Sequence, residues 1–207
     1  HKISNFFQIK DIRKLNLKKK FKIISAFSIF YDLKSPNNFI KEVKSILDKE
    51  GIASSLKKYA TVINVNLCGV FNVMAKCAEQ MAKNEPDEKG ERGVIINISS
   101  GAAFEGQIGQ SAYSGSKAGV NGMNIPAARE LARYGIRVNS IAPGLFGTPM
   151  VKSLGEKVVN SLVEMCEAPK RMGEMEEFAH TCSFLFENGY MNGRIVRLDG
   201  ATVMQAK

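Results

Sequence analysis

Two short, largely apolar runs separated by a long helical stretch constrain the fold of this chain more than any other feature. The runs lie at 94–98 and 136–142, and between them residues 111–134 are rich in small side chains and predict a helix. Strands that alternate with helices favour a parallel sheet that is covered on both faces. In such sheets ligands bind beyond the carboxyl ends of the strands. Ser100 and Pro143-Gly144 directly follow the two runs, so we expect both at that edge.

The remaining patterns predict further elements. Helical periodicity indicates helices at 39–50, 59–83, 151–167 and 174–187, and a last strand is expected at 195–198. Gly51 is expected to end the helix at 39–50. The apolar segment 21–33 fits either a strand or a buried helix. Because no run of 18 or more apolar residues occurs, no membrane span is expected.

Composition divides the chain into two unlike parts. Residues 1–60 hold 14 Lys and Arg against five Asp and Glu, whereas 61–207 hold 15 of each. The whole net charge of +9 therefore lies in the first part. All 18 glycines lie at or after Gly51. We expect residues 1–50 to be an atypical basic segment and residues 51–207 to be the catalytic part of a domain.

Three residues form the chemical centre of the sequence. Ser100 follows the first apolar run, Tyr113 comes 13 residues later, and Lys117 follows Tyr113 by four. Positions i and i+4 share a helix face, so Tyr113 and Lys117 are expected side by side. A nearby ammonium favours the phenolate and lowers the tyrosine pKa. The phenol could then exchange a proton with a carbonyl or alcohol, while the serine hydroxyl holds the same oxygen.

In this order these motifs resemble the short-chain dehydrogenase/reductase family from about Tyr59 to the C-terminus. Asn66 matches the family's helix asparagine, and Ser100, Tyr113 and Lys117 match its catalytic residues. Pro143-Gly144 with Thr148 matches the segment that closes over the nicotinamide. The resemblance implies an α/β, Rossmann-like doubly wound parallel sheet that here lacks its N-terminal half.

The resemblance also implies roles for these residues in hydride transfer between NAD and a secondary alcohol or ketone. Tyr113 takes the hydroxyl proton, Lys117 lowers its pKa and holds the nicotinamide ribose, and Asn66 links Lys117 to solvent through a water. Pro143, Gly144, Phe146 and Thr148 are implied to contact NAD. Ser100 and Gln107 are implied to contact the substrate, and residues 150–170 to form either a substrate lid or ordinary core or interface packing. No metal site is expected, because the four cysteines and two histidines lack ligand spacing.

Several sequence runs narrow the resemblance to members that act on 3-hydroxyacyl-CoA thioesters or hydroxysteroids. Among them is the run Ala103-Phe104-Glu105-Gly106-Gln107. This implies a homotetramer in the mitochondrial matrix, where such a protein also serves in a tRNA-processing complex. The alternative is therefore a catalytically inactive binding or scaffold protein. Lys18-Lys19-Lys20 could contact RNA phosphates, although a solvated charged face is favoured.

The first half departs from the family pattern. The family's Gly-x-x-x-Gly-x-Gly turn lets the backbone approach the dinucleotide pyrophosphate, and the first glycine of this chain is Gly51. We therefore expect residues 1–50 to be foreign to the fold and NAD binding to be impaired in this form. About half of the sheet would be missing, and one edge of the rest would be exposed.

Overall fold

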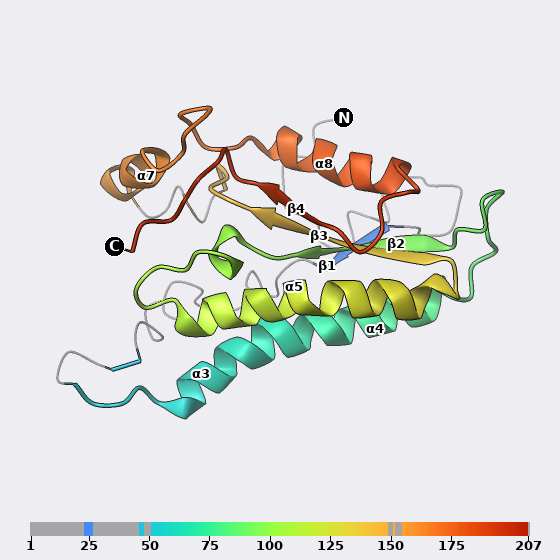
Figure 1. Cartoon of the computed structure of the whole chain (residues 1–207), viewed down its shortest axis with the longest axis horizontal. Helices are drawn as coiled ribbons and strands as arrows, with labels where there is room; N and C mark the ends of the chain where they lie inside the picture. The colour runs from blue at the N-terminus through green and yellow to red at the C-terminus, as the bar shows by residue number, and fades with distance from the viewer. Residues whose placement is uncertain (1–22, 27–45, 48–50, 149–150, 152–154, 207) are drawn as a thin grey trace.

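A four-stranded parallel sheet organises the molecule in the computed structural model, which describes residues 23–26, 46–47, 51–148, 151 and 155–206. The strand order is β1-β2-β3-β4, and helices cover both faces of the sheet (Figure 1). The strands are β1 (Ile23–Ala26), β2 (Gly93–Ile98), β3 (Ile136–Pro143) and β4 (Ile195–Leu198). The helices are α3 (Leu56–Ile63), η2 (Asn64–Cys68), α4 (Gly69–Met81), η3 (Gly101–Ala103), α5 (Ser111–Ala132), α7 (Glu156–Val163) and α8 (Met175–Glu187).

The central strands β2 and β3 are buried on both faces, as their apolar sequences predict. Every residue of β2 is buried, and β3 is buried from Ile136 to Ala142. The two strands pair in parallel from Gly93 opposite Ile136 to Ile98 opposite Ile141. Their carboxyl ends therefore lie together, and both following loops start at one edge of the sheet.

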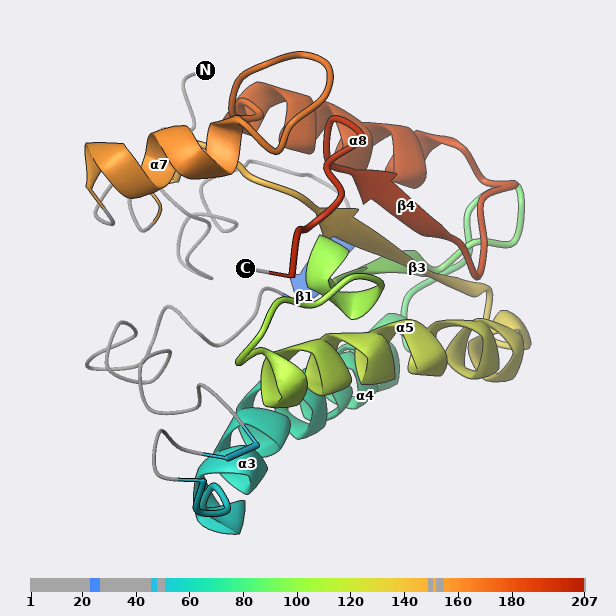
Figure 2. The same ribbon diagram turned by 60° about the vertical axis from the view of Figure 1, so that its left-hand side comes forward.

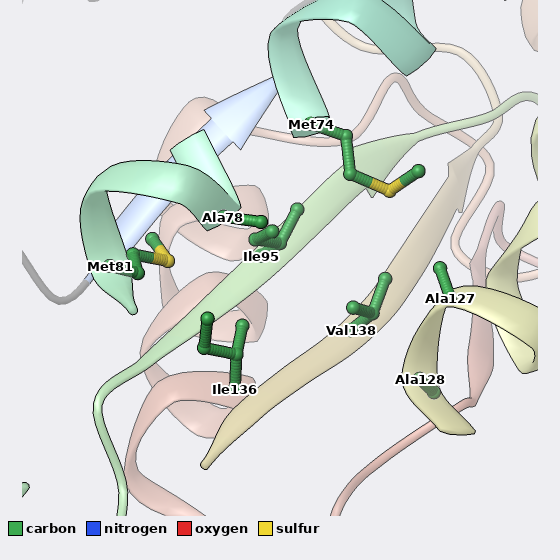
Figure 3. Close-up of a cluster of buried hydrophobic side chains, with 8 residues drawn as sticks. All are labelled: Met74, Ala78, Met81, Ile95, Ala127, Ala128, Ile136 and Val138. Atoms are coloured by element: carbon green, nitrogen blue, oxygen red, sulfur yellow. The ribbon is translucent and has the colours of Figure 1, made fainter. Parts of the chain in front are cut away.

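Alternate side chains of β2 feed two separate cores. Ile95 points toward α4 and α5, where it packs in a cluster that includes Met74, Ala127 and Val138 (Figure 3). Val94, Ile96 and Ile98 point to the opposite face and pack with Leu185 of α8. Figure 2 shows the resulting layers, with α4 and α5 on one side of the sheet and α8 on the other.

The helix α3–η2–α4 presents one buried stripe to the rest of the domain. Its buried residues recur about every four positions: Val62, Asn66, Val70, Met74, Ala78 and Met81. By length and composition alone Leu56–Met81 is apolar enough to cross a membrane, but core helices of soluble domains pass the same test. Here the stripe packs against α5 and β2.

Two predicted helices differ from the structure. At 39–50, the residues described are Ile46 and Leu47, and Leu47 forms a β-bridge with Ala53 instead of a helix. Gly51 lies between Leu47 and Ala53 in the sequence and has a φ of 77°, which glycine adopts without strain. Within the helix predicted at 151–167, the structure has α7 at Glu156–Val163, which begins after Gly155 at a φ of 88°, and Val151 is also helical.

The basic N-terminal segment contributes one strand. Ile23–Ala26 pairs in parallel with β2, from Ile23 opposite Val94 to Ala26 opposite Asn97. The edge of β2 that was expected to be exposed is thus covered by these four residues, whereas the foreign origin of residues 1–50 stays a prediction. Apart from Ile46 and Leu47, the rest of that segment lies outside the described residues.

Candidate active site

Ser100 lies where β2 ends and is held by the backbone around it. The sheet pairing continues one residue beyond β2, where the Ser99 amide donates to the Ile141 carbonyl at 2.8 Å. Ser100 then caps the short helix η3, and its Oγ accepts a hydrogen bond from the Ala102 amide at 3.2 Å. This N-cap geometry fixes the hydroxyl at the carboxyl edge of the sheet with 9% of the residue exposed.

Tyr113 and Lys117 project from the first turns of α5 beside Ser100. The Lys117 Nζ lies 5.9 Å from the centroid of the Tyr113 ring, so the predicted i, i+4 pairing is present. Lys117 is only 2% exposed, and its Nζ donates to the Ile98 carbonyl at 2.9 Å. The Ser99 hydroxyl in turn donates to the Lys117 carbonyl at 3.2 Å. The end of β2 therefore anchors the lysine at both its side chain and its backbone.

Burial controls the ionisation of this pair. It lowers the pKa of Lys117 from 10.5 to about 8. Burial raises the pKa of Tyr113, and a hydrogen bond with the Ser100 hydroxyl opposes the rise. The expected lowering of the tyrosine pKa by Lys117 is therefore not found, because desolvation of the phenol dominates. At neutral pH Tyr113 is therefore a protonated phenol.

Asn66 lies in the π-helical turn η2, fully buried against α5. Its Nδ2 donates to the Ser116 Oγ at 3.2 Å, and the Ser116 hydroxyl donates to the Tyr113 carbonyl at 2.6 Å. The Asn66 Oδ1 is buried and has no hydrogen-bond partner in the structure. A buried acceptor of this kind normally binds a water, which fits the water-holding role implied by the resemblance.

The sequence interpretation missed Ser116, which joins Asn66 to the backbone of Tyr113. Its position was visible in the sequence, since it lies between Tyr113 and Lys117 on the same helix. The signal was weak, because a serine within a helix that is rich in small residues usually marks close packing.

The segment after β3 carries the residues expected to contact NAD. Gly144 lies so close to Asp199 that a Cβ on it would be 2.7 Å from the Asp199 Cβ, and only glycine fits there. Phe146 is buried and meets the Phe178 ring edge-on at 5.7 Å between centroids. Thr148 is buried, and its Oγ1 accepts from the Val151 amide at 3.3 Å. The structure thus places Pro143, at the end of β3, and these residues beside the Ser100 edge of the sheet.

Gln107 lies in the loop between Ser100 and Tyr113 and is partly buried. Its Nε2 donates to the Gln205 carbonyl at 3.3 Å, and its Oε1 accepts from the Gln110 Nε2 at 3.4 Å. The C-terminal tail therefore contacts the residue that was predicted to bind the substrate.

The residues at this edge fit the nicotinamide end of NAD. Among the described residues Lys117 makes one side-chain hydrogen bond, so its ammonium retains donors for ribose hydroxyls. Gly144 has no side chain, so no side chain at this position keeps a ligand away from the backbone directly after β3. No glycine-rich turn that would receive the pyrophosphate occurs before Gly51 in the sequence. Within the described residues no group of three or more His, Cys, Asp or Glu side chains could hold a metal ion.

Comparisons with known proteins agree with this arrangement. A family model for short chain dehydrogenases matches residues 45–159. Human 3-hydroxyacyl-CoA dehydrogenase type-2 is 53% identical over 157 residues, which are 76% of this chain and 60% of the human protein. Human (3R)-3-hydroxyacyl-CoA dehydrogenase is 42% identical over 145 residues, which are 69% of this chain and 53% of that protein.

A solved structure confirms the predicted fold class. The crystal structure of 3-hydroxyacyl-CoA dehydrogenase type-2 from Mycobacterium avium superposes with a TM-score of 0.76 at 41% sequence identity. The match covers 80% of this chain and 64% of that chain. The chain thus spans less than two thirds of the length of each of these proteins.

Proposed function

Because this chain belongs to the short chain dehydrogenase family, we propose that it transfers a hydride between NAD and a secondary alcohol or ketone. The observation that carries the proposal is the convergence of Ser100, Tyr113 and Lys117 at the carboxyl edge of β2. The names of the relatives, two 3-hydroxyacyl-CoA dehydrogenases, support a 3-hydroxyacyl-CoA thioester as the substrate class. A hydroxysteroid is the second class, and it rests on the sequence resemblance alone.

The chemistry of the chain's own residues is proton transfer. When bound, NAD supplies the hydride acceptor. Ser100 offers a hydroxyl to the substrate oxygen, and Tyr113 exchanges the proton with that oxygen. Since burial holds the pKa of Tyr113 above its ordinary value, the phenol is ready to donate a proton during ketone reduction. Alcohol oxidation requires the phenolate, so its rate should rise with pH.

The buried network behind Tyr113 supports this role. With a pKa of about 8, Lys117 is mostly protonated at neutral pH and contributes positive charge next to the phenol. Asn66 and Ser116 fix the backbone of Tyr113 from the side of η2. A water on the free Asn66 Oδ1 would extend the proton path from Lys117 toward solvent.

We assign α7 to cover the substrate. None of its residues is buried, and Val158 is 46% exposed. Figure 1 shows α7 beyond the carboxyl ends of β3 and β4. An apolar helix face there suits contact with an acyl chain, and packing against another subunit remains the competing use of the same face.

Assembly and location are further parts of the proposal. Exposed apolar side chains on α3 and α4, among them Leu56, Tyr59 and Phe71, support contact with a second copy of the chain and hence a homotetramer. The mitochondrial matrix and a place in a tRNA-processing complex rest on the resemblance alone. Size-exclusion chromatography with light scattering tests the oligomer, and a monomer at micromolar concentration would contradict it.

Titration of the 207-residue chain with NAD by calorimetry tests the proposal and separates it from a catalytically silent binding protein. We expect saturable but weak binding, because the residues at the nicotinamide end are present and the glycine-rich turn is not. Tight binding would contradict the expected impairment. Absence of NAD binding, together with RNA association that weakens steeply with salt, would favour the binding protein instead.

A further inference from the structure

We propose that Arg197 is a positioning residue that holds the Ser100 hydroxyl in place through the serine loop, defined here as residues 101–110. This loop joins Ser100 to Tyr113 and carries Gln107. Arg197 lies on β4, 92 positions away from its loop partner Glu105. The catalytic consequence rests on the proposed function, whereas the restraint on the loop does not.

The guanidinium of Arg197 donates hydrogen bonds from all three of its nitrogens. Its Nη1 and Nη2 donate to the two carboxylate oxygens of Glu105 at 2.9 and 3.3 Å. Its Nε donates to the Asp199 carboxylate at 2.7 Å, and its Nη2 also donates to the Thr202 carbonyl at 3.2 Å. The group stacks over the Phe104 ring, 5.1 Å from its centroid. A planar fork used in this way fixes direction as well as distance.

Two hydrogen bonds connect Glu105 to the turn that holds the Ser100 hydroxyl. The Glu105 amide donates to the Gly101 carbonyl at 3.2 Å, beside the Phe104 amide, whose bond of 3.0 Å to the same carbonyl closes η3. Within that turn the Ala102 amide donates to the Ser100 Oγ at 3.2 Å. A shift of Glu105 therefore moves the turn whose amide orients the serine hydroxyl.

The other partner of Arg197 contacts the segment after β3. Asp199 lies against Gly144, where a Cβ would be 2.7 Å from the Asp199 Cβ. The Gly144 amide also donates to the Leu198 carbonyl at 2.9 Å. Arg197 thus ties the serine loop to the strand end that supports the proposed nicotinamide contacts, and it sets the spacing between the two sides of the site.

Because the Arg197–Glu105 ion pair is partly exposed, its effect on the serine loop can be tested without unfolding the domain. The side chains of Arg197 and Glu105 are 34% and 32% exposed, so water reaches the pair and screens its charges. Loss of the pair should therefore leave the domain folded while it frees the serine loop. The far end of the loop keeps a separate restraint, because the Ile108 amide donates to the Ala206 carbonyl at 3.0 Å.

Hydrogen exchange of the full chain tests the restraint without any need for activity. We expect Arg197→Met and Glu105→Gln to speed exchange of the serine-loop amides about tenfold. Glu105→Gln removes the same ion pair from the other side, so it decides the question if Arg197→Met does not fold. Arg171→Met is the matched control, because Arg171 makes a similar two-oxygen contact with Glu177 elsewhere on the surface. Unchanged serine-loop exchange in both test variants, or equal acceleration by Arg171→Met, would overturn the proposal.

Kinetics then test the consequence for the site. With NAD and 3-hydroxybutyryl-CoA, Arg197→Met should lower kcat about tenfold, as expected for a misplaced reacting group. KM for NAD should stay within about twofold, and Arg197→Lys should recover part of kcat because it keeps one charged contact. Equal kcat for wild type and Arg197→Met would overturn the positioning role. If the wild type shows no turnover, the proposed function fails, and the exchange experiment still decides whether Arg197 restrains the loop.

Discussion

Lys117 illustrates how far residue spacing predicts chemistry. The i, i+4 spacing correctly placed Lys117 beside Tyr113. The direction of the tyrosine pKa shift was not predictable, because it depends on how deeply α5 and β2 bury both groups. That the buried Asn66 Oδ1 lacks a hydrogen-bond partner was also not predictable, since it depends on the π-helical turn η2. Spacing therefore predicts neighbours, whereas solvation has to be taken from the structure.

Burial of Lys117 predicts a distinctive dependence of stability on pH. Its pKa is about 8 in the folded chain and 10.5 ordinarily, a difference that corresponds to about 3 kcal/mol. Below about pH 8 both states are charged and the burial penalty is fully present. Between about pH 8 and 10.5 the unfolded chain binds more protons, so stability rises with pH and the penalty disappears.

Lys117→Met removes this ionisation at nearly constant volume. We expect the free energy of unfolding of the wild type, relative to that of the variant, to increase by about 1–2 kcal/mol between about pH 7.5 and about pH 9.5. Urea denaturation at several pH values measures the difference between the two proteins. A difference that is constant over this range would contradict a lowered pKa for Lys117.

Asn66→Ala should affect catalysis more than stability. The change removes the only described side-chain link to Ser116 and the free Oδ1 that would bind a water. We expect kcat to fall about ten- to a hundredfold, because general acid–base steps contribute on this scale. Steady-state kinetics beside thermal unfolding provide the measurement.

The matched control for that experiment is Asn124→Ala. Asn124 is also buried in this domain, but it bonds the Ser140 hydroxyl and the Arg194 carbonyl and lies outside the proton path. Asn124→Ala should lower the melting temperature more than Asn66→Ala does, and it should lower kcat less. The reverse ranking would show that Asn66 has a structural role only.

At the scale of elements, the last three strands and the helices predicted at 59–83, 111–134 and 174–187 agree with the structure, whereas two other predicted helices differ from it. The strands β2 and β3 and the helix α5 agree with the apolar and small-residue patterns. The helix predicted at 151–167 is interrupted at Gly155, where the backbone has a positive φ that hydrophobic periodicity does not reveal. The helix predicted at 39–50 failed at Leu47, where pairing with Ala53 overrides the local pattern.

Gly144→Ala tests the close approach of the two strand ends. A methyl group there would lie 2.7 Å from the Asp199 Cβ and 2.8 Å from its Cα. The added atom should cost about 1–3 kcal/mol in the free energy of unfolding, since neither neighbour is a flexible side-chain end. Chemical denaturation of the variant measures this loss.

Gly122→Ala is the control for that substitution. A Cβ at Gly122 would meet nothing within 4 Å, and the residue lies inside helix α5. It should stabilise the chain by about 0.5–1 kcal/mol, because alanine loses less conformational freedom in a helix than glycine. Equal effects from both substitutions would contradict the tight contact between Gly144 and Asp199.

At the scale of the whole molecule, the sequence predicted the sheet but not its outer strand. Alternation of strands and helices indicated a parallel sheet, and the structural match supports that fold class. The segment 21–33, which contains β1, fits either a strand or a buried helix by sequence, because a short apolar run is compatible with both. Its pairing with β2 depends on the partner strand and not on its own sequence.

The candidate catalytic residues and the glycine-rich turn expected to bind NAD belong to different parts of the fold. Ser100, Tyr113, Lys117 and Asn66 all lie after Leu56 in the sequence, so all four residues of the proposed proton path are among the described residues. The glycine-rich turn expected for NAD has no counterpart before Gly51 in the sequence. We therefore expect turnover by this 207-residue chain to need far more NAD than a typical dehydrogenase does.

The most direct test is the rate of NADH formation from 3-hydroxybutyryl-CoA at high NAD, compared between the wild type and Tyr113→Phe. Phenylalanine keeps the ring beside Lys117 and removes the hydroxyl that is proposed to exchange the proton. We expect measurable turnover by the wild type and a rate lower by about a thousandfold in Tyr113→Phe, the scale of a lost general acid–base group. Equal rates for the two proteins at every NAD concentration would contradict the assignment of Tyr113 as the proton-transfer residue.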